Sequence, residues 1–157
     1  MIDSALLGVV VGGVIGLSAQ LISARYAKQQ AWADTRRDTY SRYLETISIG
    51  RRRLEEQVRR RLDGKEDAAD YQEDRQRIRE EAIAGWNTVR LVSRTRALAG
   101  AGRELQIRIA TLNEMLERER PLNQQELDLV LTTYESDRGK FVEAAQIEMG
   151  LRTPLFR

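Results

Sequence analysis

Hydrophobic residues are distributed very unevenly along this chain. Residues 4–24 form a run without a charged side chain, SALLGVVVGGVIGLSAQLISA, which Asp3 and Arg25 bracket. As an α-helix with a rise of about 1.5 Å per residue, this run spans roughly 30 Å, the thickness of the hydrocarbon core of a bilayer. A soluble helix that is apolar on every face needs a larger protein around it than the rest of this chain can supply. The pattern therefore predicts a transmembrane anchor at residues 1–24.

Small and polar residues repeat at every fourth position of this run, and we call them the glycine seam: Ser4, Gly8, Gly12, Gly16, Gln20 and Ala24. Positions four apart share one helix face, where small side chains let a second helix approach closely and a glutamine can hydrogen-bond across the contact. Glycine is also generally more frequent in membrane helices, which is the competing explanation. The four-residue register favours a helix–helix contact, and we expect the seam to be the interface of a homo-oligomer.

Basic and aromatic residues follow the apolar run directly. The candidate contacts with lipid headgroups are Arg25, Tyr26, Lys28, Trp32, Arg36 and Arg37. The positive-inside rule places these basic residues on the cytoplasmic side. The expected topology is a single pass through the inner (plasma) membrane, with the N-terminus outside and the C-terminal domain in the cytoplasm. A cleaved signal peptide is not expected, because the start lacks a basic n-region and no A-x-A-like site follows the run.

Beyond residue 24 the pattern becomes that of polar and amphipathic helices. Residues 28–39 present an almost wholly polar face, and residues 25–39 are predicted to form a basic stalk. Residues 40–150 predict a helical bundle, and residues 151–157 form a tail. The fold class is therefore all-α, a single N-terminal transmembrane helix continuing into a cytosolic bundle of about four helices. A short coiled coil over residues 40–62 is the alternative for that segment, although Arg51 interrupts its apolar stripe.

Glycine, proline and capping residues divide the bundle. The first helix continues from the anchor to the turn at Asp63-Gly64, the second covers about 67–98, and residues 99–102 break the chain. The third covers about 103–120, and the last runs from 124 to 149, between an Asn123/Glu126 capping box and Gly150. The predicted core consists of Tyr40, Leu44, Ile47, Leu54, Val58, Leu62, Tyr71, Ile78, Ile83, Trp86, Val89, Val92, Leu105, Ile109, Leu112, Leu116, Leu127, Leu131, Tyr134, Phe141 and Ala145.

Charge alternates along the chain although the formal net charge is only +2. Residues 25–62 carry 11 basic and 5 acidic side chains, whereas residues 63–81 carry 4 basic and 8 acidic ones. If the chain folds back near Gly64, the acidic segment meets the arginine triplets at 51–53 and 59–61. This intramolecular pairing is preferred to an anionic-lipid or protein contact of the triplets, and nucleic acid is the least favoured partner.

Composition removes most routes to catalysis. The chain has no cysteine and no histidine, and thus lacks thiolate ligands and the commonest general base near neutral pH. Asp70 and Asp74 share a helix face, but no nucleophile accompanies them, and they predict a solvated acidic surface. Residues 99–102 lack the Lys-Ser/Thr of a phosphate loop. We expect no enzyme activity, no cofactor and no metal.

Two short patterns are similar to those of other proteins. Trp32-x3-Arg36-x3-Tyr40-x3-Leu44 follows the glycine-rich span, and Phe141-Val142-Glu143-Ala144-Ala145 precedes Gly150. This combination resembles uncharacterised small single-span bacterial or phage membrane proteins with a cytosolic helical domain. The resemblance implies topology and no activity.

The sequence therefore favours a non-enzymatic, membrane-anchored scaffold that self-associates and presents its bundle to a cytosolic protein partner. An oligomeric membrane-perturbing or pore-forming protein, such as a defence effector or a phage-type membrane protein, is the first alternative. Ser18, Gln20 and Ser23 would be a poor polar lining for a pore. A regulatory membrane anchor for a partner enzyme is the second alternative.

Overall fold

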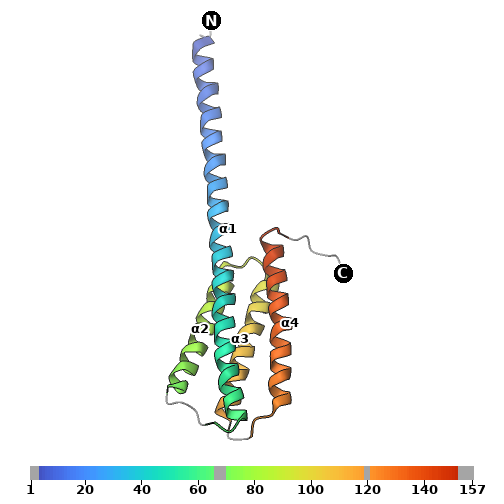
Figure 1. Ribbon diagram of the computed structural model, residues 1–157. Helices are drawn as coiled ribbons and strands as arrows, with labels where there is room; N and C mark the ends of the chain where they lie inside the picture. Colours follow the sequence, from blue (N-terminus) through green and yellow to red (C-terminus); the bar gives the residue numbers. More distant parts are fainter. Residues whose placement is uncertain (1–3, 66–69, 119–120, 152–157) are drawn as a thin grey trace, which may run out of the picture. The chain divides into compact units, whose positions relative to one another are not determined.

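The computed structural model describes the backbone of residues 4–65, 70–118 and 121–151, and the side chains of the same residues except 4–22 and 24. Four α-helices make up these residues: α1 (Ser4–Leu62), α2 (Tyr71–Val92), α3 (Arg96–Glu117) and α4 (Gln124–Glu148). The chain divides into two compact units, Met1–Thr35 and Arg36–Arg157. The second unit contains the bundle, in which consecutive helices run in opposite directions (Figure 1). The all-α class and the helical bundle predicted from the sequence are confirmed.

Both predicted glycine stops are confirmed, and they use the same hydrogen-bond pattern. After α1, Gly64 has φ 71°, the amide of Gly64 donates to the carbonyl of Arg61, and the amide of Lys65 donates to that of Arg60. After α4, Gly150 has φ 72°, and the next amide, that of Leu151, donates to Gln146. These are Schellman motifs, which need a residue in the left-handed region where glycine has no Cβ penalty.

The boundary between α2 and α3 was predicted wrongly. The break lies at residues 93–95, and the expected break at residues 99–102 lies inside α3. Thr95 is the N-cap of α3, with extended backbone and a side-chain oxygen that accepts the Leu98 amide at 3.3 Å. Gly102 stays helical because it is packed, since an added Cβ would lie 3.3 Å from Cε2 of Phe141. Tertiary contacts therefore outweigh the modest helix cost of glycine.

Helix α4 starts at the predicted cap. The side chain of Asn123 accepts the Gln125 amide at 2.9 Å, which satisfies one of the free donors of the first turn. Glu126, predicted as the other half of a capping box, accepts a hydrogen bond from Arg118 at 2.6 Å. This ion pair spans residues 119–120 and ties the end of α3 to the beginning of α4.

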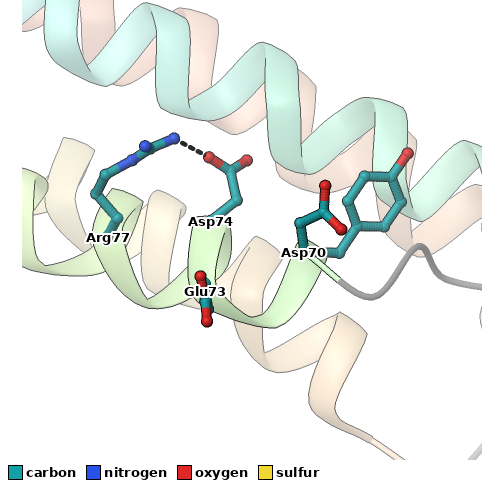
Figure 2. Close-up of a pocket in the computed structure, with 5 residues that line it drawn as sticks. Asp70, Glu73, Asp74 and Arg77 are labelled. Atoms are coloured by element: carbon teal, nitrogen blue, oxygen red, sulfur yellow. Dashed lines mark hydrogen bonds and ion pairs between the residues drawn. The ribbon is translucent and has the colours of Figure 1, made fainter.

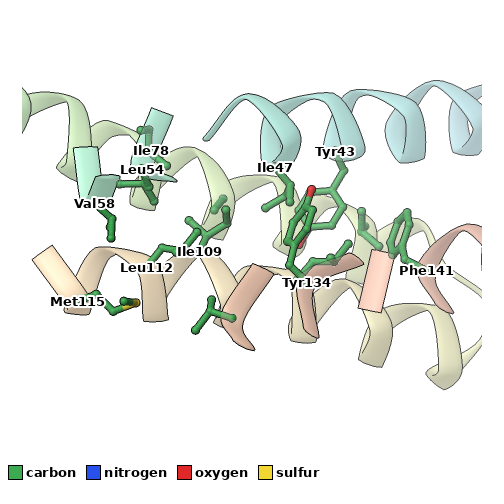
Figure 3. Packing of buried hydrophobic residues seen from close by; sticks show 14 of the residues in the cluster. Tyr43, Ile47, Leu54, Val58, Ile78, Ile109, Leu112, Met115, Tyr134 and Phe141 are labelled. Atoms are coloured by element: carbon green, nitrogen blue, oxygen red, sulfur yellow. The ribbon is translucent and has the colours of Figure 1, made fainter. Parts of the chain in front are cut away.

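The core of the bundle is continuous along the four helices (Figure 3). Most predicted core positions are buried, including all four of α3. The prediction that Ile83 is buried is wrong, because 37% of its surface is exposed. Tyr43 and Val130 are buried and were not predicted. The buried hydrophobic set is Tyr40, Tyr43, Ile47, Leu54, Val58, Ile78, Ala82, Val89, Leu98, Leu105, Ile109, Leu112, Met115, Leu116, Leu127, Val130, Tyr134, Phe141 and Ala145.

Two glycines allow α1 and α2 to approach closely. A Cβ added at Gly85 of α2 would lie 2.7 Å from Cδ2 of Tyr43 in α1, and one added at Gly50 of α1 would lie 2.8 Å from Cγ2 of Ile78 in α2. Real Cβ atoms do not come this close to neighbouring carbons, so each helix leaves a gap that a side chain of the other fills. The tyrosine ring also reaches across the bundle, where its hydroxyl donates to the carbonyl of Gly102 at 2.5 Å.

Candidate functional site

The part of α1 that follows the uncharged run is a solvent-exposed basic segment, residues 25–35. Every side chain described in this range is exposed. The exposed residues include the predicted headgroup contacts Arg25 and Lys28 and two aromatic residues, Tyr26 with 65% and Trp32 with 47% of its surface exposed. Tyrosine and tryptophan combine an apolar ring with a polar atom, which suits them to protein contacts and to membrane–water interfaces. The segment is therefore a candidate contact surface.

Arg36 and Arg37, the last two predicted headgroup contacts, differ sharply in environment. Arg37 is exposed. Arg36 is only 9% exposed, and its Nε donates to the carbonyl of Val92 at 3.2 Å. This hydrogen bond satisfies a carbonyl at the end of α2, where helices leave acceptors without intrahelical partners. Arg36 therefore holds the bundle together, and its guanidinium is engaged at the end of α2.

The glycine seam lies in α1, but the side chains of Ser4, Gly8, Gly12, Gly16, Gln20 and Ala24 fall outside the described residues. Over the residues whose side chains are described, no helix combines the length and the apolar character that crossing a bilayer requires.

The two arginine triplets are mostly engaged inside the bundle. Arg53 pairs with Asp74 of α2 at 2.9 Å, which confirms that the chain folds back to bring the acidic segment against the first triplet. Arg51 and Arg59 pair with one carboxylate, that of Glu55 on their own helix. Arg61 donates to two carbonyls at the end of α3, those of Leu116 and Arg118, and Arg60 lies over the ring of Tyr71 with Cζ 5.8 Å from the centroid.

The acidic residues singled out in the sequence line an open groove of about 520 Å³ at the start of α2 (Figure 2). Its lining consists of Asp70, Tyr71, Glu73, Asp74 and Arg77. Asp74 accepts hydrogen bonds from Arg53 at 2.9 Å and from Arg77, so its charge is compensated within the bundle. Within the described ranges there is no group of three acidic side chains arranged to hold a metal ion.

A carboxylate network fastens the α2–α3 connection to the end of α4. The carboxylate of Glu148 accepts four hydrogen bonds: from the Tyr40 hydroxyl at 2.6 Å, the Arg94 amide at 3.0 Å, and the amide and hydroxyl of Thr95 at 3.1 and 2.9 Å. Burial opposes ionisation of Glu148, but these donors outweigh it and hold its pKa below the ordinary value. Burial, and then the bond to Glu148, raises the pKa of the Tyr40 hydroxyl. The sequence pattern gave no sign of this network.

A second network joins α3 to α4 through a buried carboxylate. Asp137 is almost fully buried, and it accepts hydrogen bonds from Arg108 Nε at 2.9 Å and from Lys140 Nζ at 2.8 Å. Burial raises the pKa of Asp137, but the two cations more than offset this and lower it overall. Both networks connect helices, and in each the carboxylate accepts hydrogen bonds from several donors.

Comparison of the chain with family models, with curated proteins and with solved structures finds no match in any of the three. The candidate site therefore rests on the exposed basic and aromatic segment and on the bundle that follows it.

Proposed function

We propose that this protein is a single-pass, membrane-anchored helical scaffold that self-associates through the glycine seam and presents its bundle to a protein partner in the cytoplasm. The observation that carries the proposal is the change at Arg25. An uncharged stretch of 21 residues precedes it, and a segment follows in which every described side chain is exposed. A helix with these two consecutive parts is suited to a bilayer and its interface.

The exposed aromatic residues support an interfacial position for the start of the stalk, and the basic residues support the orientation of the anchor. Tyr26 directly follows Arg25, and Trp32 lies about two turns further on. Tyrosine and tryptophan concentrate at the headgroup level of membranes, where the ring is buried and the polar atom stays hydrated. With Arg25, Lys28 and Arg37 on the same side of the uncharged stretch, the bundle belongs in the cytoplasm.

The polar networks of the bundle support a scaffold rather than an enzyme. Glu148 and Asp137 use their charge to hold helices and a connection in place. Carboxylates that accept hydrogen bonds from several parts of the chain in this way stiffen a fold. A rigid bundle surface is the feature that a cytosolic partner would recognise.

Membrane fractionation tests the anchor. The full chain should remain in the membrane pellet after alkaline carbonate extraction. The double variant Val10→Arg/Val14→Arg should move to the supernatant, because each arginine near a helix centre costs roughly 2.5–3.5 kcal/mol on insertion. The matched control Ala27→Arg/Ala31→Arg adds the same charge outside the uncharged stretch and should stay in the pellet. Extraction of the unmodified chain by carbonate would refute the anchor.

Cross-linking in isolated membranes tests the seam. The chain contains no cysteine, so Ser4→Cys provides a single thiol reporter on the seam face. Oxidation should give a disulfide-linked dimer, and adding Gly12→Leu should abolish it by separating the helices. Val10→Leu, on another face of the same helix, is the control and should leave the dimer unchanged. Equal dimer yields for both variants would show that the seam is not the interface.

A further inference from the structure

Three arginines and two hydroxyl groups line a groove between α1 and α4 in the bundle. Its volume is about 270 Å³, and its lining consists of Ser48, Arg51 and Arg52 from α1 and Tyr134, Glu135 and Arg138 from α4. The groove is open to solvent, in contrast to the core directly beneath it, where Tyr134 is buried. Its residues take no part in the proposed anchor or seam.

The lining carries an excess of positive charge. Three guanidinium groups face one carboxylate, which leaves a formal charge of +2 on these six residues. The pair within the lining compensates little of this charge, because Arg138 and Glu135 are 3.8 Å apart and both about half exposed. Outside the lining, Arg51 forms a mostly buried ion pair with Glu55. Glu55, the partner of Arg51, is shared with Arg59. A ligand with two negative charges would match this excess.

Donors in the groove lack acceptors among the described residues. The Nε of Arg51 is buried and has no hydrogen-bond partner there. Arg52 donates from Nε to the carbonyl of Ser48 at 3.4 Å, which leaves its two terminal nitrogens for another acceptor. The hydroxyls of Ser48 and Tyr134 lie 3.3 Å apart, so one of the two protons can point away from the pair. A buried donor without an acceptor, such as the Nε of Arg51, is uncommon in proteins and needs an explanation. The terminal nitrogens of Arg52 are on an exposed side chain and are accessible to a ligand in the groove.

Packing fixes the central guanidinium in advance. Cζ of Arg51 lies 5.4 Å from the ring centroid of Tyr134, and the ring itself is held in the core. A guanidinium positioned over an aromatic ring loses less freedom on binding an anion. Arg51 already donates to Glu55, so the guanidinium forks that can donate two hydrogen bonds at once to phosphate oxygens are those of Arg52 and Arg138.

We propose that this groove binds a phosphate group, the free ion or a phosphomonoester. A phosphomonoester carries about −1.5 to −2 charges at neutral pH, and its three terminal oxygens can accept from several guanidinium groups together. A carboxylate carries one charge and two oxygens and would leave the lining under-compensated. The source of the phosphate is either a soluble compound or a lipid headgroup, and both offer the same chemistry to the arginines.

Calorimetric titration of the full chain in detergent, in buffer free of phosphate and sulfate, tests the proposal with inorganic phosphate as the probe. We expect saturable binding to the unmodified protein and a loss of affinity of about tenfold or more in Arg52→Gln/Arg138→Gln. The control Arg42→Gln/Arg79→Gln removes the same charge from exposed positions outside the groove and should bind as the unmodified protein does. Arg52→Lys keeps the charge without the fork and should bind more weakly than the unmodified protein.

Absence of binding would overturn the proposal, and so would equal losses in the groove pair and in the control pair, because these would indicate diffuse charge. A second titration with short-chain phosphatidic acid identifies the source. Affinity for this lipid that exceeds affinity for inorganic phosphate supports a headgroup ligand, and the reverse order supports a soluble one. The phosphate-binding proposal is independent of the membrane anchor. If carbonate released the unmodified chain from the membrane, the anchor would be refuted, but phosphate binding in the groove would still be expected.

Discussion

Residues 25–35 and residues 36–62 belong to the same helix, α1, and have opposite surroundings. In the first range every described side chain is exposed, whereas the second contributes Tyr40, Tyr43, Ile47, Leu54 and Val58 to the core. Both ranges are helical, so helix formation does not distinguish them. The difference lies in the apolar stripe, which supplies tertiary stabilisation only to the second range. Helical content alone therefore does not indicate where this protein is stable.

The largest expected difference between the bundle and the exposed segment comes from removing an aromatic side chain of the core. Phe141 is fully buried between Tyr40 and Tyr43, with ring centroids 6.2 and 5.4 Å away. Phe141→Ala should lower the free energy of unfolding by about 3–5 kcal/mol, because it removes buried area and leaves a cavity. Urea denaturation followed by near-ultraviolet circular dichroism measures this loss. Trp32→Ala, in the exposed segment, should change it by less than about 0.5 kcal/mol, and similar losses for both would contradict the division.

Two glycines of the bundle should respond to alanine with opposite signs. Gly85→Ala forces a Cβ against the buried ring of Tyr43 and should destabilise the bundle by about 1–3 kcal/mol. Gly139→Ala meets no atom within 4 Å and should stabilise α4 by up to about 1 kcal/mol, through the higher helix propensity of alanine. Thermal denaturation of the two variants side by side gives both signs. A stabilising Gly85→Ala would mean that α1 and α2 are further apart than described.

Acid should loosen the bundle through its bonded carboxylates. The pKa of Glu148 lies below the ordinary value of 4.5. Its contribution to the free energy of unfolding is therefore complete above pH 4.5 and disappears as the pH falls through the lowered pKa. Glu148→Gln should remove part of this acid dependence and cost roughly 1 kcal/mol at neutral pH. Unfolding measured from pH 7 to pH 3 checks both effects. An unchanged acid slope in the variant would remove Glu148 from the explanation, while Asp137 provides a second lowered pKa to examine.

A contrast between two neighbouring arginines locates the point at which the two ranges of α1 meet. Arg36→Gln removes the hydrogen bond to Val92 and should cost about 0.5–1.5 kcal/mol. Arg37→Gln removes the same charge from an exposed position and should leave stability unchanged. If the two variants were equally stable under thermal denaturation, the bundle would begin later than residue 36.

Local signals sufficed for the helix ends that glycine or a cap defines. Gly64, Gly150 and Asn123 each impose a backbone state or supply an acceptor, so their neighbours in the sequence reveal the boundary. The break at residues 93–95 has no glycine or proline; Thr95 is its local cap signal, and Glu148, more than 50 residues away, also bonds it. A hydrogen bond between residues so far apart in the chain cannot be predicted from the hydrophobic periodicity of the sequence.

The candidate sites also separate into those that neighbouring sequence reveals and those that depend on contacts between distant helices. The exposure of Arg25, Tyr26, Lys28 and Trp32 agrees with a sequence stretch that offers them no apolar neighbours. The burial of Arg36 and Tyr43 could not be read in this way, because each uses a polar atom to bond a backbone carbonyl of a distant helix. The arginine groove likewise depends on the α1–α4 pairing, which brings Ser48 and Tyr134 together across 86 positions.

The contact of Phe141 with Tyr40 and Tyr43 has a consequence for the order in which the protein can mature during synthesis. The ribosome produces the two tyrosines about 100 residues before the phenylalanine that completes their packing. The apolar stripe of residues 40–58 can meet α2 and α3 earlier, but its packing stays incomplete until the last helix emerges, and contacts of such long range form slowly. During this interval the stripe is a target for chaperones or for premature association with neighbouring nascent chains. Synthesis, rather than the finished fold, is the stage at which this bundle is most vulnerable.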